Sequence, residues 1–357
     1  MKKPRLLLAA LLSCAALLLF LHVRNIQQKG LEKFSTDFFD TFDTHVVFTA
    51  YTADREAFET YAGIVHEEML RLHRLFDIYH DYGGVANLKT VNDNAGISAV
   101  EVAPEILDLL EVSKRACYET EGAVDISLGR VFALWSACRE AALSGEGEPR
   151  LPDPDELRAA ADVSVEDIVI DRENSTVFLR REGMRVDVGA TAKGYATQKT
   201  IERLREAGLG SALLNAGGNV CAVGKPGDGR EAWSVGVRSP DAGGEDALLD
   251  VVSVADRAVV SSGDDQRYFV VDGRKYHHII DPGTLFPAEN VRAVTVIHAD
   301  AAVADILSTA AFILPLEKAG ELVAGNGADA FWLLRDGTKI ATRGYTVISK
   351  AARGSAE

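Results

Sequence analysis

Apolar residues recur every three or four positions in several stretches of the chain, which is the spacing of a helix that buries one face. The stretch from Asp54 to Ile78 shows this spacing most clearly, and Asp54 is placed to act as its N-cap. Pro104 stands at a favourable first-turn position for a second helix, which Gly122 ends. Further helices are predicted over residues 128–143 and 301–314.

Short strands joined by tight turns dominate the second half of the chain. Asp272-Gly273 and Asp336-Gly337 are strong two-residue hairpin signals, and residues 145–154 read as a surface loop. Hairpins outnumber strand–helix–strand units, so the predicted fold class is α+β, with mixed, mostly antiparallel sheets and packed helices. Strands are predicted over residues 167–170, 176–180, 185–188, 211–214, 266–271, 274–280, 291–298, 331–335 and 338–341.

The N-terminus carries a basic segment followed by an uninterrupted apolar run. Lys2, Lys3 and Arg5 precede the run from Leu6 to Val23. A charged segment before an apolar core is typical of an export signal, and this run is long enough to span a bilayer. The basic flank is expected to stay in the cytoplasm, which sends the rest of the chain outward.

Two forms of membrane attachment fit residues 1–24. An uncleaved anchor is favoured, because lipidation of Cys14 after cleavage would leave an unusually apolar mature start. In both cases the catalytic part is tethered at the extracytoplasmic face of the cell membrane. One folded domain is expected over residues 40–345, followed by a polar C-terminal tail over residues 346–357.

Charge and cysteine content exclude several classes of partner and site. The net charge of −15 disfavours binding to nucleic acid or to anionic lipid headgroups. No CxxC or Cys/His metal spacing occurs among the four cysteines. The three cysteines of the folded part, Cys117, Cys138 and Cys221, are expected to be buried free thiols.

A strand, a glycine turn and a helix start follow one another from Asp187 to Tyr195. Free N–H groups at a helix start favour an anion, and Lys193 in the first turn opposes the helix dipole unless a negative group lies nearby. A phosphate would supply that group, although a plain turn with a solvated lysine fits equally well. The paired glycines in residues 215–220 allow close approach to a ligand, or simply a tight turn.

Two further groups of residues suggest chemistry. His277 and His278 are adjacent on a predicted strand and therefore point to opposite faces. His278 can then face a pocket and, with Asp281, hold or deprotonate a hydroxyl. Alternatively, both histidines make structural hydrogen bonds. Asp305 and Thr309 lie one helical turn apart on one face. A carboxylate with a hydroxyl suits Mg²⁺, which keeps water ligands and also binds phosphate oxygens. Alternatively, the two side chains hydrogen-bond to each other.

In order and spacing these segments resemble the ApbE family of FAD:protein FMN transferases. The resemblance extends from about residue 40 to about residue 345 and includes upstream matches at residues 76–79, 124–127 and Trp135. Each motif is modest, but five in the right order are specific. The five are Asp187–Ala196, Ala216–Asn219, Ser261–Asp264, His278–Pro282 and Ala304–Ala310.

The resemblance implies a role for particular residues. The Mg²⁺ ligands would be the Asp305 carboxylate, the Thr309 hydroxyl and the Ala190 carbonyl. His278 would be the base or orienting group at the acceptor hydroxyl, and Asp281 would support its loop. The residues that bind FAD would be Tyr79, Asp125, Ser127, Asp187, Lys193 and Tyr276.

The implied reaction moves FMN from FAD, the substrate, to a threonine or serine hydroxyl of an acceptor protein, such as a subunit of a membrane redox complex. AMP is released and Mg²⁺ is required. FAD hydrolysis at the same site and non-catalytic FAD binding are the alternatives. Two positions depart from the family pattern: Asp265 replaces an aromatic residue, and Leu285 replaces a glycine, which is expected to change the local turn.

Overall fold

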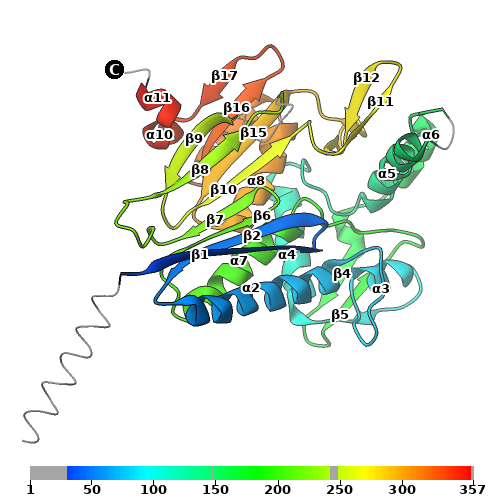
Figure 1. Ribbon diagram of the computed structural model, residues 1–357. Helices are drawn as coiled ribbons and strands as arrows, with labels where there is room; N and C mark the ends of the chain where they lie inside the picture. The colour runs from blue at the N-terminus through cyan, green and yellow to red at the C-terminus, as the bar shows by residue number, and fades with distance from the viewer. Residues whose placement is uncertain (1–29, 146–147, 242–247, 355–357) are drawn as a thin grey trace, which may run out of the picture.

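An eight-stranded antiparallel sheet runs through the centre of the protein, as the computed structural model shows for residues 30–145, 148–241 and 248–354 (Figure 1). The spatial order of its strands is β1-β2-β6-β7-β10-β15-β16-β17. The strands are β1 (Glu32–Thr41), β2 (Thr44–Thr52), β6 (Ala212–Ala216), β7 (Asn219–Val223), β10 (Ala258–Gly263), β15 (Val291–His298), β16 (Asp329–Leu334) and β17 (Lys339–Ala341).

Helices cover one face of this sheet. Side chains alternate between the two faces along a strand, so Cys221 joins the core beneath the helices while its neighbours Val220 and Ala222 join a second core on the other side. Figure 1 shows the long helix α2 lying along the β1–β2 side of the molecule. The helices that build the first core are α2 (Arg55–Phe76), α4 (Pro104–Glu119), α7 (Ala192–Glu206), α8 (Ala301–Ile313) and α9 (Leu316–Gly325).

The opposite face is covered by the hairpin of β8 (Trp233–Arg238) and β9 (Leu248–Val254) together with the C-terminal helices (Figure 1). Helices α10 (Arg343–Ile348) and α11 (Lys350–Gly354) lie where a polar tail was expected. Between them, the buried Ser349 hydroxyl donates to Asp250 on β9, so this part of the C-terminus is packed against the hairpin.

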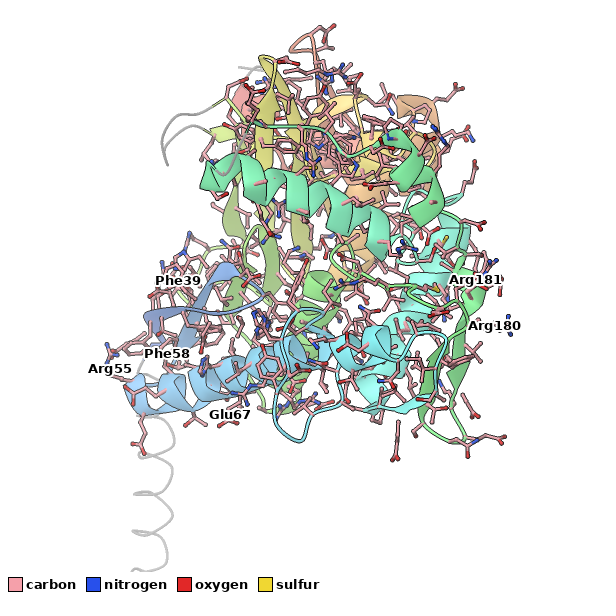
Figure 2. All side chains as sticks on the ribbon, turned by 90° about the vertical axis from the view of Figure 1, so that its right-hand side faces the viewer. Phe39, Arg55, Phe58, Glu67, Arg180 and Arg181 are labelled. Atoms are coloured by element: carbon pink, nitrogen blue, oxygen red, sulfur yellow. The ribbon has the colours of Figure 1, made fainter. Side chains whose placement is uncertain are left out.

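Smaller elements surround the end of the sheet where the loops gather. The remaining elements are α3 (Leu88–Asp93), α5 (Gly129–Ser144), α6 (Pro154–Ala160), a 3₁₀ turn (Val165–Asp167), a three-stranded sheet of β3 (Val100–Glu101), β5 (Thr176–Leu179) and β4 (Ile168–Asp171), and the hairpins β11 (Tyr268–Val271)–β12 (Arg274–His277) and β13 (Ile280–Asp281)–β14 (Phe286–Pro287). Figure 2 shows Arg180 and Arg181, which follow β5, extending outward on this side, while Arg55 and Glu67 extend from helix α2.

The predicted α+β class, helices and hairpin turns are confirmed, with ends shifted by a few residues. The strand predicted over residues 274–280 is wrong in its second half, because β12 ends at His277 and a separate strand, β13, begins at Ile280. The Asp54 side chain accepts from the Ala57 N–H, as an N-cap does. The strand predicted over residues 185–188 is wrong beyond a single bridge at Arg185. The Asn92 side chain binds the N–H and the carbonyl of Val186 at 2.8 and 3.0 Å and so takes the bonds that a neighbouring strand would make.

The structure describes the cysteines of the folded part but not the N-terminal segment. The predicted anchor, with Cys14, lies outside the described residues, and among those residues no helix is long and apolar enough to cross a membrane. Cys117, Cys138 and Cys221 are free, as predicted; Cys117 and Cys221 are buried and Cys138 is only partly so. Burial raises the pKa of the Cys117 and Cys221 thiols to about 12, so both stay protonated at neutral pH.

Helices α7 and α8 cross at an unusually short distance, and a glycine makes this possible. A Cβ on Gly194 would lie 2.4 Å from the Asp305 Cβ and 2.6 Å from the Ala301 carbonyl oxygen. No side chain larger than hydrogen fits there without moving one helix. This contact brings the start of α7 against the middle of α8.

We expect Gly194→Ala to destabilise the protein by about 1–3 kcal/mol, because the added methyl group overpacks the contact between α7 and α8. Thermal unfolding of the full-length protein in detergent measures the change. The control is Gly320→Ala in α9, where a Cβ meets nothing within 4 Å. It should stabilise α9 by up to about 1 kcal/mol through helix propensity. Equal stability of the two variants would contradict the proposed contact.

Candidate active site

A cavity of about 690 Å³ opens at the end of the central sheet, a volume typical of a small-molecule site. Its walls come from α5, α7, α8, β10, β12 and the loops between them. Nine of the predicted site residues line it: Tyr79, Asp125, Asp187, Ala190, Lys193, Tyr276, His278, Asp305 and Thr309. The chain therefore brings together positions that are up to 230 residues apart, since 309 − 79 = 230.

The Asp305 carboxylate caps helix α7 from the neighbouring helix α8. Its Oδ2 accepts from the Gly194 N–H at 2.8 Å, and Gly194 lies in the first turn of α7, where N–H groups lack partners within the helix. The Thr191 side chain, at the N-cap position, makes no capping bond of its own. Burial of the 6% exposed Asp305 raises its pKa, while the charge of Lys193 opposes that effect.

The groups around Asp305 fit a magnesium ion that is completed by substrate and water. Asn219 is buried close enough to this carboxylate to lower the pKa of Asp305, but neither its Nδ2 nor its Oδ1 makes a hydrogen bond of good geometry among the described residues. The Thr309 hydroxyl and the Ala190 backbone also reach the cavity. Buried polar atoms without partners are costly, so they indicate a missing ligand. Within the described residues no group of three His, Cys, Asp or Glu side chains could hold a metal alone.

Three cations converge on the cavity of a protein that is acidic overall. Lys193 lies at the start of α7, its Nζ 3.5 Å from the Gly189 carbonyl oxygen. Arg139 of α5 and Arg267 before β11 also line the cavity, and neither forms an ion pair within the described part of the chain. Neither arginine falls within one of the five motifs, so the sequence did not single them out. Their charges would attract an anion such as a diphosphate.

The two neighbouring histidines have different surroundings, as predicted. His277 is 4% exposed; its Nε2 lies 2.9 Å from the Ala288 carbonyl oxygen, and its Nδ1 accepts from the Ile279 N–H. His278 lines the cavity and is exposed to the space inside it. Desolvation by the protein around the cavity, with the nearby charge of Arg267, lowers the pKa of His278 to about 3. Its imidazole is therefore neutral at physiological pH.

One wall of the cavity is aromatic. The Trp135 ring lies 5.9 Å from Tyr276 in a stacked arrangement and 6.2 Å from Phe269. The three rings come from α5, β12 and β11, so the hairpin packs directly on the helix. Aromatic faces of this kind suit a planar heterocycle such as a flavin or an adenine.

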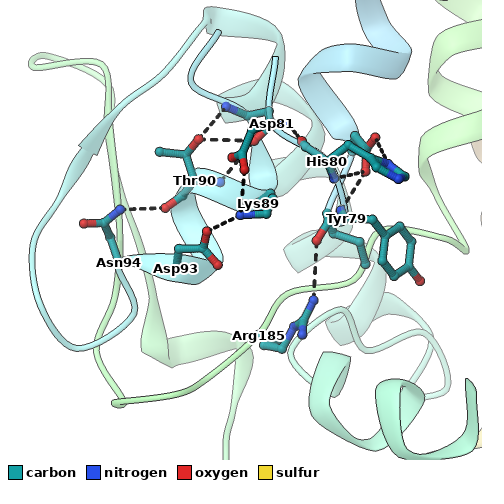
Figure 3. Close-up of polar contacts among 11 residues, drawn as sticks. Tyr79, His80, Asp81, Lys89, Thr90, Asp93, Asn94 and Arg185 are labelled. Carbon is teal, nitrogen blue, oxygen red and sulfur yellow. Dashed lines mark hydrogen bonds and ion pairs between the residues drawn. The ribbon is translucent and has the colours of Figure 1, made fainter. Parts of the chain in front are cut away.

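A network of polar contacts holds the loop that carries Tyr79. The buried Asp77 carboxylate accepts from the Tyr79 N–H at 2.6 Å and from the Tyr82 hydroxyl at 2.7 Å. Arg185 donates to the carbonyl of Ile78 in the same loop. Figure 3 shows the Tyr79 ring pointing away from these contacts, and the ring is 58% exposed where it borders the cavity. The backbone around Tyr79 is thus fixed while its ring stays available.

Two of the predicted residues lie outside the cavity wall. The Ser127 hydroxyl, 1% exposed, donates to the Asp125 carboxylate at 2.6 Å, so Ser127 orients Asp125 from behind. The Asp281 Oδ1 accepts from the Gly283 N–H at 2.8 Å, so its carboxylate closes the turn after His278. For both, the motif located the right segment, but only the fold decided which side chain reaches the cavity.

The two departures from the family pattern are accommodated in different ways. Leu285 has φ +62°, the left-handed conformation that glycine adopts most easily. The Trp135 Nε1 donates to the Leu285 carbonyl at 3.0 Å, which helps to hold this conformation. Asp265 lies away from the cavity wall and is 3.6 Å from Arg238 across an ion pair.

Comparison with known proteins gives a consistent result. A family model described as the ApbE family matches residues 42–332. A protein of Treponema pallidum named FAD:protein FMN transferase is 37% identical, over 70% of this chain and 71% of its own length. One of the same name from Klebsiella pneumoniae is 31% identical, over 71% of this chain and 78% of its own.

Solved structures share the fold. The ApbE protein of Thermotoga maritima superposes with a TM-score of 0.78 at 29% identity, covering 89% of this chain and 99% of its own. The apo flavinyl transferase ApbE of Pseudomonas stutzeri gives a TM-score of 0.72 at 25% identity, covering 89% and 96%. These likenesses agree with the α+β architecture described above.

We expect the neutral state of His278 to make the protein less stable in mild acid. Free histidine in the unfolded chain protonates near its ordinary pKa of 6.5, whereas folded His278 stays neutral down to about 3. Between these values the unfolded state binds more protons, so the free energy of unfolding falls as pH falls. His278→Gln should lose less stability than the wild type between about pH 7 and about pH 5. Denaturation midpoints measured at both pH values check this, and identical losses would contradict it.

Proposed function

This chain belongs to the ApbE family, and on that basis we propose that it transfers FMN from FAD to a threonine or serine hydroxyl of another protein. The chain is accordingly an enzyme, a flavin transferase. The observation that carries the proposal is the meeting of Asp305, Thr309, Ala190 and Lys193 at one cavity. These residues surround the space that a dinucleotide's diphosphate would occupy.

In the proposed reaction the acceptor oxygen forms a bond to the FMN-side phosphorus of FAD. The bond between that phosphorus and the bridging oxygen breaks, and AMP leaves with the bridging oxygen. The proton of the acceptor hydroxyl passes to a base. No oxidant or reductant takes part, so the chemistry depends on positioning and on neutralising the phosphate charge.

Magnesium fits the donor set of this cavity. The Asp305 carboxylate, the Thr309 hydroxyl and the Ala190 carbonyl would hold it, and Asn219 would bind one of its waters or a phosphate oxygen. When bound, Mg²⁺ neutralises diphosphate charge and stabilises the leaving phosphate. Lys193 adds a second positive charge at the start of α7, where free N–H groups also favour an anion.

His278 is the candidate base, and the charges around it explain how it can serve. Arg267, Lys193 and Arg139 contribute to the low pKa of His278 in the empty cavity. A bound diphosphate would pair with these cations, which raises the pKa of His278 toward the range of an effective base. Neutral His278 would then accept the proton from the acceptor hydroxyl only when FAD is in place.

The setting proposed for this reaction is the outer face of the cell membrane. The supporting observation is the basic segment at Lys2, Lys3 and Arg5 before the apolar run from Leu6 to Val23. The acceptor would be an exported protein or a subunit of a membrane redox complex that faces the same side. Whether residues 1–24 remain as an anchor or Cys14 carries a lipid, the cavity would be tethered near such partners.

We expect Asp305→Asn to lower transfer by about a thousandfold, because the charge that holds the metal is lost. Asparagine keeps an oxygen for the Gly194 N–H, so the cap on α7 survives where Asp305→Ala would remove it. AMP release is measured by chromatography, and Mn²⁺ binding by electron paramagnetic resonance, with full-length protein in detergent.

The matched control is Asp336→Asn, the same substitution at an exposed position that does not line the cavity. It should retain both AMP release and Mn²⁺ binding. Wild-type transfer by Asp305→Asn would make the metal assignment wrong. With wild-type protein, AMP without a covalently flavinylated acceptor indicates FAD hydrolysis, and FAD binding without any AMP indicates a binding protein.

A further inference from the structure

A second cavity of about 660 Å³ lies between helix α5 and strand β11, next to the first. The two share part of their lining, so the groove is continuous with the candidate active site. The shared residues are Arg139, Gln266, Arg267 and Phe269. Nothing in the proposed binding of FAD uses the rest of this groove.

The groove is bordered by the edge of β11, which pairs with no second strand within the described residues. β11 pairs only with β12 in a two-stranded sheet, and it is the strand of this hairpin that lies beside α5 (Figure 1). The turn at Asp272 and Gly273 has two residues, both with positive φ. In such a hairpin the pair that flanks the turn is hydrogen-bonded, and bonding then alternates along the strands. The N–H and C=O groups of Tyr268 and Val270 therefore point away from β12.

Apolar side chains gather at this edge. Leu143 on α5 is 71% exposed, Val270 is 46% exposed and Tyr268 is 41% exposed. All three line the groove. An exposed strand edge with apolar side chains is a liability for a free protein and a ready site for β-strand addition.

We propose that this groove, defined by β11 and the C-terminal half of α5, binds the acceptor as an extended segment that adds to the free edge of β11. The inference rests on the proposed transferase function and specifies how its protein substrate is held. Main-chain bonds to Tyr268 and Val270 would supply affinity. Apolar side chains at alternate positions of the acceptor would contact Val270 and Leu143.

The register of the hairpin links this groove to the reacting groups. Tyr268 pairs with His277 across the hairpin, and His278 is the next residue along the chain. A segment paired with β11 would therefore run past Tyr268 toward the shared residues Arg267 and Gln266 and into the active-site cavity. Its hydroxyl would arrive beside His278 while FAD occupies the cavity behind.

Binding of a synthetic peptide tests the proposal without needing the natural acceptor. The probe is a short fluorescein-labelled peptide of alternating valine and threonine, titrated by anisotropy into the full-length protein with FAD and Mg²⁺. We expect Val270→Lys and Leu143→Lys each to raise its Kd at least about tenfold, because both replace apolar contacts with a charge. The matched control is Ile97→Lys, at a position that is 73% exposed and lines neither cavity.

Two further peptides distinguish strand addition from nonspecific hydrophobic binding. Each is N-methylated on alternate amides, so that the methyl groups lie on one edge or on the other. Strand addition predicts that one peptide loses binding and the other keeps it. Equal binding of the two methylated peptides would overturn the proposal, as would equal binding of the unmodified peptide by Val270→Lys and by the wild type. Self-association of the protein through this groove, measured by sedimentation, would also overturn it.

FAD titration and AMP release in the same samples separate this inference from the proposed function. If the wild type binds the peptide but neither binds FAD nor releases AMP, the transferase proposal fails and the groove stands only as a peptide site. If FAD is bound and cleaved but the groove variants bind the peptide with the same Kd as the wild type, only the groove proposal fails.

Discussion

The contact between the Asp305 carboxylate and the Gly194 N–H joins the two helices on which the candidate site depends. It satisfies a free N–H at the start of α7 and holds a buried carboxylate in place with one bond. The missing side chain of Gly194 permits the approach. Because a carboxylate has two oxygens and a charge, the same residue can join α7 to α8 and present negative charge to a metal ion.

The cavity carries a cluster of positive charges, whereas the whole molecule is negatively charged. The chain has a net charge of −15, yet Lys193, Arg139 and Arg267 meet at one cavity. A local cluster of this kind selects an anionic ligand that the overall surface would repel. Desolvation and, after it, these cations lower the pKa of His278, so the binding of phosphate and the basicity of the imidazole are linked through charge.

The hairpin β11–β12 connects recognition to chemistry. Its two-residue turn sets the register, the register places Tyr276 on the aromatic wall, and the chain after β12 delivers His278 to the cavity. Leu285 shows how firmly this region is specified, since it adopts a glycine-like conformation while Trp135 holds its carbonyl. The packing of the hairpin on α5 stabilises the turn against the preference of its own residue.

The sequence by itself determined the local features: helices with one apolar face, the Asp54 cap, the Asp-Gly turns and the motifs that carry Asp305, Thr309 and Lys193. These follow from interactions between residues close along the chain. The sequence did not predict the eight-stranded sheet, because strands such as β7 are buried on both faces and lack an alternation of apolar and polar residues. Only the tertiary structure decided that Arg139 and Arg267 reach the cavity while Ser127 and Asp281 support it from behind. Which side chain faces a shared space depends on how distant segments pack, and local spacing does not encode that.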